Sequence, residues 1–192
     1  QGSPEGAILA LRTGFGMARQ IGQGPSLLHL MVGVGAAGSM CREVEQLVQL
    51  EDAPNLYAAL AALPKPFVDV EKAIEIDKTM AVQLPPGMQM TRTQIESQMA
   101  ASYEQVRLLV RRLERDVAAL QCLEAIRSYA ASHSGQLPAT LGEITEVPVP
   151  QNPVTGEPFR YTRTGAAAVL ESAAGPGRDQ KEENRYEITV KN

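Results

Sequence analysis

Residues 92–134, RTQIESQMAASYEQVRLLVRRLERDVAALQCLEAIRSYAASHS, form the longest periodic stretch of this 192-residue sequence and decide its fold class. Apolar side chains recur in it at steps of four and three: Ile95, Met99, Tyr103, Val106, Val110, Leu113, Val117 and Leu120. Such spacing is typical of the seam between two long packed helices. A single helix of this length would extend about 65 Å. We therefore expect a kink, or earlier helices packed along its whole length.

Shorter helices with short breaks between them are expected before this stretch. Their predicted ranges are 5–22, 27–50, 56–63 and 68–82. Gly22 and Pro25 separate the first two helices, and a connection this short predicts an antiparallel hairpin. Pro64 and Pro66 end the third helix because proline cannot continue it. The segment 84–88, LPPGM, is the strongest internal boundary.

The pattern changes from helix to strand after Gly135. Strands are predicted at 159–162, 167–172 and 185–191, with a tight hairpin link at 163–165. In the last of them Tyr186, Ile188 and Val190 alternate with polar residues, as in a half-buried strand. The sequence thus predicts an α-rich α+β fold. In it a helical hairpin and short helices pack on one long helix, and a small three-stranded antiparallel sheet follows.

The expected organisation has three regions that form one compact unit. They are the hairpin and short helices at 1–90, the long helix at 91–135 and the sheet at 136–192. The opening residues Gln1-Gly2-Ser3 resemble the remnant of a cleaved purification tag, so we expect the natural chain to begin upstream.

Composition and charge narrow the class of protein. A hydrophobic fraction of 44% excludes general disorder, and an aromatic fraction of 4% disfavours an all-β fold. Eighteen basic and 22 acidic side chains give a net charge of −4, whereas phosphate binding needs clustered, uncompensated Lys and Arg. We therefore expect no nucleic-acid partner. No run approaches the roughly 18 apolar residues of a membrane helix, so no membrane span is expected within this sequence.

Two patterns invite a functional reading. Residues 33–38, GVGAAG, match the dinucleotide fingerprint G-x-G-x-x-G, but no βαβ unit surrounds them and a helical stripe runs through them. We interpret these glycines as small residues that let two helices approach closely, and we expect no cofactor. Cys41 and Cys122 each lie in an apolar helical stretch, as buried free thiols or, alternatively, as a helix-to-helix disulfide.

The remaining candidates for chemistry favour structural roles. His29 and His133 have no partner at metal-ligand spacing. The carboxylates Asp69, Glu71, Glu75 and Asp77 lie close together, but Lys72 and Lys78 accompany them. A solvated, salt-bridged face is therefore favoured over an acid/base pair.

The C-terminal part carries the most specific pattern. It comprises 152–161, NPVTGEPFRY, then 169–172, VLES, and then 175–179, GPGRD. This pattern resembles the C-terminal sheet of the type II secretion major pseudopilins, although Asn152 replaces an acidic residue of that family. The resemblance implies a loop that can bind calcium, through Ser172 and Asp179.

The whole chain also resembles a second group of proteins. Its segments PSL at 25–27, PNLYAAL at 54–60 and LPKP at 63–66 are similar to those of uncharacterised proteins common in planctomycete bacteria. That group joins a helical region to a small sheet, and it has no established activity to carry over.

These observations leave two functional hypotheses. The first is a non-catalytic bacterial cell-envelope or extracytoplasmic protein that binds a protein partner or associates with itself. The alternative is a ligand-binding protein or an enzyme that uses a groove between the helices, with His29, Glu71 or Glu75 converging there. A calcium-stabilised loop at Ser172 and Asp179 is compatible with either hypothesis.

Overall fold

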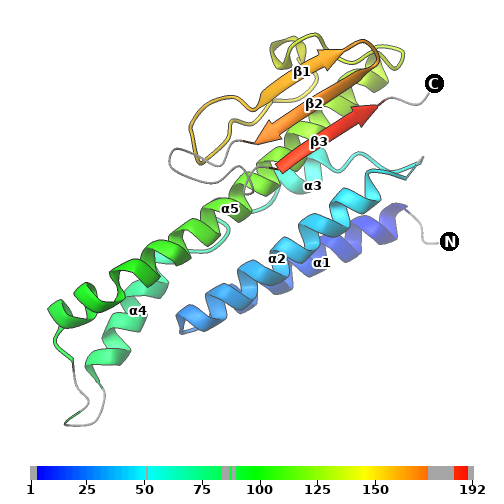
Figure 1. Cartoon of the computed structure of the whole chain (residues 1–192). Coiled ribbons are helices and arrows are strands. Elements are labelled where there is room, and N and C mark those ends of the chain that lie inside the picture. Colours follow the sequence, from blue (N-terminus) through cyan, green and yellow to red (C-terminus); the bar gives the residue numbers. More distant parts are fainter. Residues whose placement is uncertain (1–3, 51, 84–86, 88–89, 173–183, 190–192) are drawn as a thin grey trace.

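The computed structural model describes residues 4–50, 52–83, 87, 90–172 and 184–189. Its α-helices are α1 Pro4–Gly22, α2 Leu27–Leu47, α3 Tyr57–Ala61, α4 Val70–Val82 and α5 Arg92–Ser132. A single 3-10 turn at Leu141–Glu143 precedes the strands β1 Arg160–Thr164, β2 Ala167–Ser172 and β3 Asn184–Thr189. The predicted α-rich α+β fold, with one long helix and a small antiparallel sheet, is confirmed (Figure 1).

Helix α5 is the axis on which the other elements pack. Thr91 begins it with a capping box, in which the Thr91 hydroxyl accepts from the Gln94 N–H and the Gln94 side chain accepts from the Thr91 N–H. Helices α2, α3 and α4 and strand β2 all contact α5 (Figure 1). These four elements are therefore distributed along this 41-residue helix, and α1 packs on α2.

The hairpin of α1 and α2 forms because residues 23–26 turn tightly and Ser26 caps α2. The two helices approach closely at Gly33, where an added Cβ would lie 2.4 Å from the Gly22 nitrogen and 2.5 Å from the Ala18 carbonyl oxygen. This bears out the close-packing interpretation for Gly33. An added Cβ at Gly35 or Gly38 would meet nothing within 4 Å, so these two glycines do not serve that contact.

The sheet has the strand order β1-β2-β3, with both pairs antiparallel. Strand β1 runs two residues further than predicted, and the hairpin turn falls on Gly165 and Ala166 instead of 163–165. The positive φ of 64° at Gly165 permits this two-residue turn, which pairs Thr164 with Ala167. Val190, part of the predicted third strand, lies outside the described residues.

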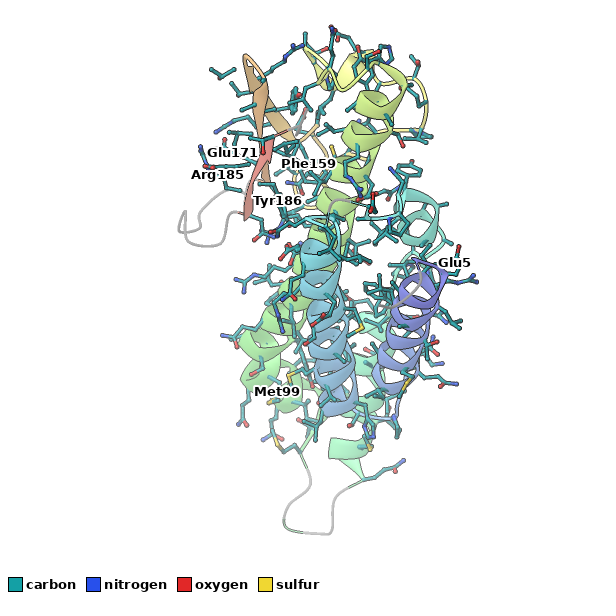
Figure 2. The ribbon with its side chains drawn as sticks, turned by 90° about the vertical axis from the view of Figure 1, so that its right-hand side faces the viewer. Glu5, Met99, Phe159, Glu171, Arg185 and Tyr186 are labelled. Carbon is teal, nitrogen blue, oxygen red and sulfur yellow. The ribbon has the colours of Figure 1, made fainter. Side chains whose placement is uncertain are left out.

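One face of the sheet packs on α5 and the other faces solvent. Leu170 and Ile188 are buried in a cluster with Ile126 of α5. Figure 2 shows Phe159 on the inner side of the sheet, whereas Arg185 and Glu171, whose charged groups are 2.8 Å apart, lie on the outer side. The sheet therefore covers only the C-terminal end of α5.

The described core consists of two clusters that share α5. The first contains the buried side chains of α1 to α4 and of α5 as far as Leu120. The second contains the C-terminal part of α5, the sheet and the loops before it. Tyr186 of β3 packs against both clusters, and its hydroxyl donates to Glu45 of α2 at 2.9 Å. We refer to these two regions as the helical end and the sheet end.

Glu124 of α5 lies at the sheet end, where it binds the segment 53–56 that crosses α5 just before α3. Its carboxylate lies 2.6 Å from Arg127 and accepts from the Leu56 N–H at 2.7 Å. Arg127 in turn donates to the Ala53 carbonyl at 2.8 Å. Burial raises the pKa of Glu124, while Arg127 and the Leu56 N–H oppose that rise. Buried polar groups here satisfy the backbone of a loop that has no regular partner.

Candidate functional site

The residues predicted to bind calcium are only partly described. Ser172, at the end of β2, is fully buried, and its Oγ donates to the Asn184 carbonyl at 3.4 Å and accepts from the Asn184 N–H at 3.3 Å. These bonds join β2 to β3. Asp179 lies outside the described residues. Within the described ranges, no group of three or more His, Cys, Asp or Glu side chains could hold a metal ion.

Asn152 begins the segment 152–161 and has a structural role in its loop. It is buried, and its Oδ1 accepts from the Val154 N–H at 2.9 Å while its backbone bonds to Glu157 and Gly156. This is the geometry of a turn closed by an Asx side chain. An amide serves that role without the charge of a carboxylate.

The acidic residues of α4 do not converge on a common point. Each of the four carboxylates contacts a group of its own helix or of α5. The contacts are Asp69 with the Lys72 N–H, Glu71 with Arg107, Glu75 with Lys78, and Asp77 with the Tyr103 hydroxyl. The hydrogen bond from Arg107 holds the pKa of Glu71 below its usual value. The predicted salt-bridged face is the arrangement that the structure has.

Both histidines lie near helix ends. His29 is exposed, and its Nδ1 lies 2.7 Å from the Ser26 hydroxyl. His133 follows α5, stacks on Tyr129 with ring centroids 3.8 Å apart, and lies 3.4 Å from Glu146. Neither histidine contacts a carboxylate of α4 among the described residues, so the structure does not bring His29 together with Glu71 or Glu75.

Both cysteines are buried free thiols, the favoured alternative of the sequence analysis. Burial raises the pKa of Cys41 and of Cys122 to about 12. A thiol with such a pKa stays protonated near neutral pH and is a poor nucleophile. Neither cysteine therefore offers a reactive site.

The exposed side of the helical hairpin is unusual because it carries many large apolar side chains. Six of the eight large apolar side chains exposed in the described chain belong to α1 and α2. Five of them flank the turn between these helices, and we call them the hairpin face: Met17, Ile21, Leu28, Met31 and Val32. On α2 their spacing of three and four residues makes one stripe.

The contacts of Phe67 explain why Met17 and Ile21 of the hairpin face are left outside. Phe15 packs on Phe67 with ring centroids 6.3 Å apart, and the Arg19 Nε donates to the Phe67 carbonyl at 3.2 Å. Two residues rotate a helix by about 200°, so Met17 and Ile21 lie on the other side of α1. The loop that contains Phe67 therefore covers one side of α1, and the hairpin face occupies the opposite side.

The hairpin face carries no charge. Between Arg19 and Arg42 the sequence has no Asp, Glu, Lys or Arg. Gly16 and Gly35 have open space around them, so another surface could approach the backbone closely there. Five exposed apolar side chains therefore gather around one turn. This exceeds the scattered single apolar residues that need no explanation.

The fold and this face define a helix-rich α+β protein with an uncharged, apolar hairpin surface. Within the described chain, no helix combines enough length with enough apolar character to cross a membrane. Comparison of the chain with protein-family models, with curated proteins and with solved structures gave no match.

The sequence analysis did not identify the hairpin face. The signal that could have revealed it is the uncharged run of 22 residues, 20–41, which has apolar residues on both sides of the predicted helix. A helix with one buried side needs only one apolar stripe. The second stripe, Leu28, Met31 and Val32, is in excess of what the core uses.

Proposed function

We propose that this chain is a non-catalytic bacterial cell-envelope or extracytoplasmic protein that acts as an assembly module. The hairpin face is the surface through which it associates with a second copy of itself. The observation that carries this proposal is the uncharged stripe of exposed Leu, Met, Ile and Val side chains on α1 and α2. The resemblance of the C-terminal segment to the sheet of the type II secretion major pseudopilins supports the envelope assignment.

A second copy is favoured as the occupant because an uncharged face is compatible with itself. In a two-fold dimer each residue patch meets the same patch of its partner, and like charges would repel there. If two hairpins met along the whole 19-residue length of α1, each would contribute about 28 Å by 20 Å and together they would bury roughly 1,200 Å², which is at the lower limit of stable protein interfaces. Antiparallel contact of two hairpins would form a four-helix layer.

The experiment compares two methionines of nearly equal exposure. Met31 of the hairpin face is 40% exposed and Met80 of α4 is 43% exposed. We expect sedimentation velocity to give a concentration-dependent dimer for the unmodified protein and for M80E. The M31E variant should remain monomeric, with its dissociation constant raised at least tenfold, because a charge would be buried without a partner.

A monomer at all concentrations up to the millimolar range would overturn the proposal, and so would dimers that M31E leaves unchanged. Co-sedimentation with phosphatidylglycerol vesicles that is lost in M31E would assign the face to a lipid surface instead. A thermal unfolding curve for each variant controls for loss of the fold, because an exposed position tolerates Glu with little change in stability.

A further inference from the structure

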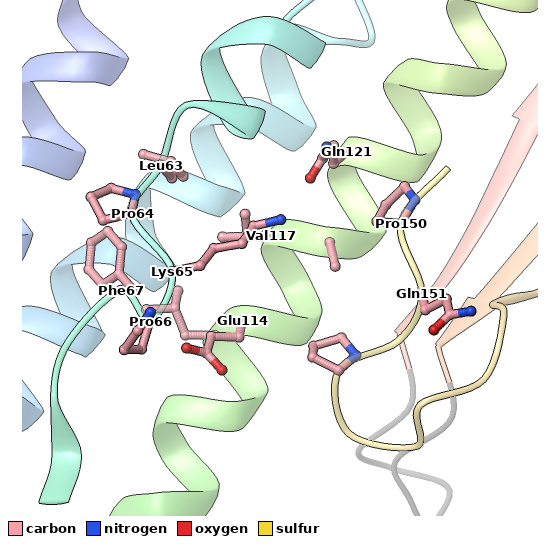
Figure 3. A pocket seen from close by; sticks show the side chains of 13 residues that line it. Leu63, Pro64, Lys65, Pro66, Phe67, Glu114, Val117, Gln121, Pro150 and Gln151 are labelled. Atoms are coloured by element: carbon pink, nitrogen blue, oxygen red, sulfur yellow. The ribbon is translucent and has the colours of Figure 1, made fainter. Parts of the chain in front are cut away.

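A pocket of about 440 Å³ lies between the middle of α5 and two proline-containing loops, residues 63–67 and 150–153 (Figure 3). Its volume falls in the range of about 300–1,000 Å³ that small-ligand sites occupy. Apolar groups form most of its wall, among them Pro64, Phe67 and Val117. Neither the hairpin face nor the histidines and α4 carboxylates considered above contribute to it.

The side of α5 that faces this pocket has an apolar floor between two hydrogen-bond acceptors. Glu114, Val117, Ala118 and Gln121 follow one another at helical spacing and all line the pocket. Gln121 is only 5% exposed, and its Oε1 has no hydrogen-bond partner among the described residues. Figure 3 shows the oxygen of Gln121 turned towards the pocket. A buried acceptor left unpaired is rare and costly, so a donor from a ligand would satisfy it.

Two opposite charges border the same space. Glu114 lies on α5, and the Lys65 side chain reaches from the facing loop towards α5 (Figure 3). No described residue forms an ion pair with either of them. Both charges are therefore available to a ligand that carries an ammonium for Glu114 and acceptors for Lys65.

The spacing of these groups limits the length of such a ligand. Glu114 and Gln121 are seven residues apart, or about 10 Å along the helix axis. Three residues of extended polypeptide cover about the same distance. Pro64 and Pro66 have no backbone N–H, so that loop supplies apolar rings and carbonyl acceptors but few donors.

We propose that this pocket binds a short apolar peptide in an extended conformation. The ammonium of the peptide pairs with Glu114, and a backbone N–H donates to the Gln121 Oε1. The Lys65 ammonium, which Figure 3 shows beside Val117, donates to a backbone carbonyl of the peptide between these two contacts, while the apolar side chains pack on the proline rings and on Val117. This site lies apart from the hairpin face and does not depend on self-association.

Isothermal titration calorimetry with the tripeptide Leu-Ala-Leu tests the proposal. We expect binding to the full chain, with at least a tenfold loss of affinity in Q121L and in E114Q. Acetylation of the peptide's amino group should weaken its binding to the unmodified protein by a similar factor. The control Q105L changes an exposed Gln on the same helix and should bind as the unmodified protein does.

Absence of heat at millimolar peptide would overturn the proposal, as would equal binding by the acetylated peptide or by Q121L. We expect Q121L to remain folded in thermal unfolding, since Leu removes an unpaired buried acceptor at similar volume. E114Q changes a partly exposed side chain and gives an independent second variant. In sedimentation velocity Q121L should associate as the unmodified protein does, so a failure here is distinct from a failure of the assembly proposal.

Discussion

The two ends of α5 bury their surfaces by different means. At the helical end the described core is apolar, and α1 and α2 meet through the small residues Gly22 and Gly33. Of the five buried polar side chains of the described chain, Arg115 lies at the helical end and four lie at the sheet end: Gln121, Glu124, Asn152 and Ser172. Three of these four, Glu124, Asn152 and Ser172, bond to the backbone of loops or strand ends, whose groups need partners, whereas helices satisfy their own backbone.

The largest effect is expected from removing the central polar group of the sheet end. The E124A variant leaves the Leu56 N–H and the Arg127 guanidinium without the carboxylate that they share. Breaking such a buried pair should lower the free energy of unfolding by about 3 kcal/mol. Urea denaturation followed by circular dichroism measures this change.

The control for this prediction is Glu104, which also lies three residues before an Arg of α5 but is largely exposed. We expect E104A to cost about 0.5 kcal/mol or less, as exposed ion pairs do. Equal losses in E124A and E104A would mean that burial of the pair contributes nothing. In that case the proposed contrast between the two ends would fail.

A smaller loss is expected from enlarging the closest helix contact at the helical end. In G33V the new side chain would collide with the backbone of Gly22 and Ala18, so α1 and α2 must separate. Overpacking of this kind costs about 1–3 kcal/mol. Urea denaturation of G33V and of G35V makes a matched comparison, because Gly35 lies two residues away with open space around it.

G35V should change the free energy of unfolding by less than about 1 kcal/mol. We expect a small increase, because Val is a better helix former than Gly. If both substitutions cost the same, helix propensity and not the close contact would be the cause. The helical end would then lack the tight backbone packing by which we distinguish it from the sheet end.

The smallest effect concerns charge at the helical end, where ion pairs stay on the surface. Arg107 lowers the folded-state pKa of Glu71, so this pair stabilises the fold above the ordinary carboxyl pKa of 4.5. That stabilisation is lost as the pH falls from 4.5 through the lower folded pKa. The E71Q variant should therefore lose about 0.5 kcal/mol or less at pH 7 and converge with the unmodified protein at low pH. Thermal unfolding between pH 3 and pH 7 checks the sign, and a gap that widens at low pH would contradict it.

Periodicity was sufficient to predict the helices and most of the sheet. The stripe from Ile95 to Leu120 is buried in the structure as a helical seam, apart from the partly buried Met99. The extension of β1 to Thr164 was missed because the turn depends on a positive φ at Gly165, which hydrophobic spacing does not encode. The shorter ends of α2 and α3 reflect caps set by local hydrogen bonds instead of by apolar pattern.

The candidate sites were harder to predict than the fold. Glu124 reads as one more charge on a long helix, and only its position opposite residues 53–56 makes it a buried anchor. The pocket needs two loops, 63–67 and 150–153, that are more than 80 residues apart in the sequence. Neither juxtaposition follows from local spacing, because both depend on how the chain returns to α5.

The bond between Tyr186 and Glu45 has a consequence for the order in which the molecule forms. Its partners are 141 residues apart, one in the last strand and one in the second helix. A contact of such long range closes a large loop, and the conformational entropy lost on closure makes it form late in folding. During synthesis on a ribosome the helical hairpin emerges long before β3, so the face of α2 around Glu45 stays without this partner until β3 has been made.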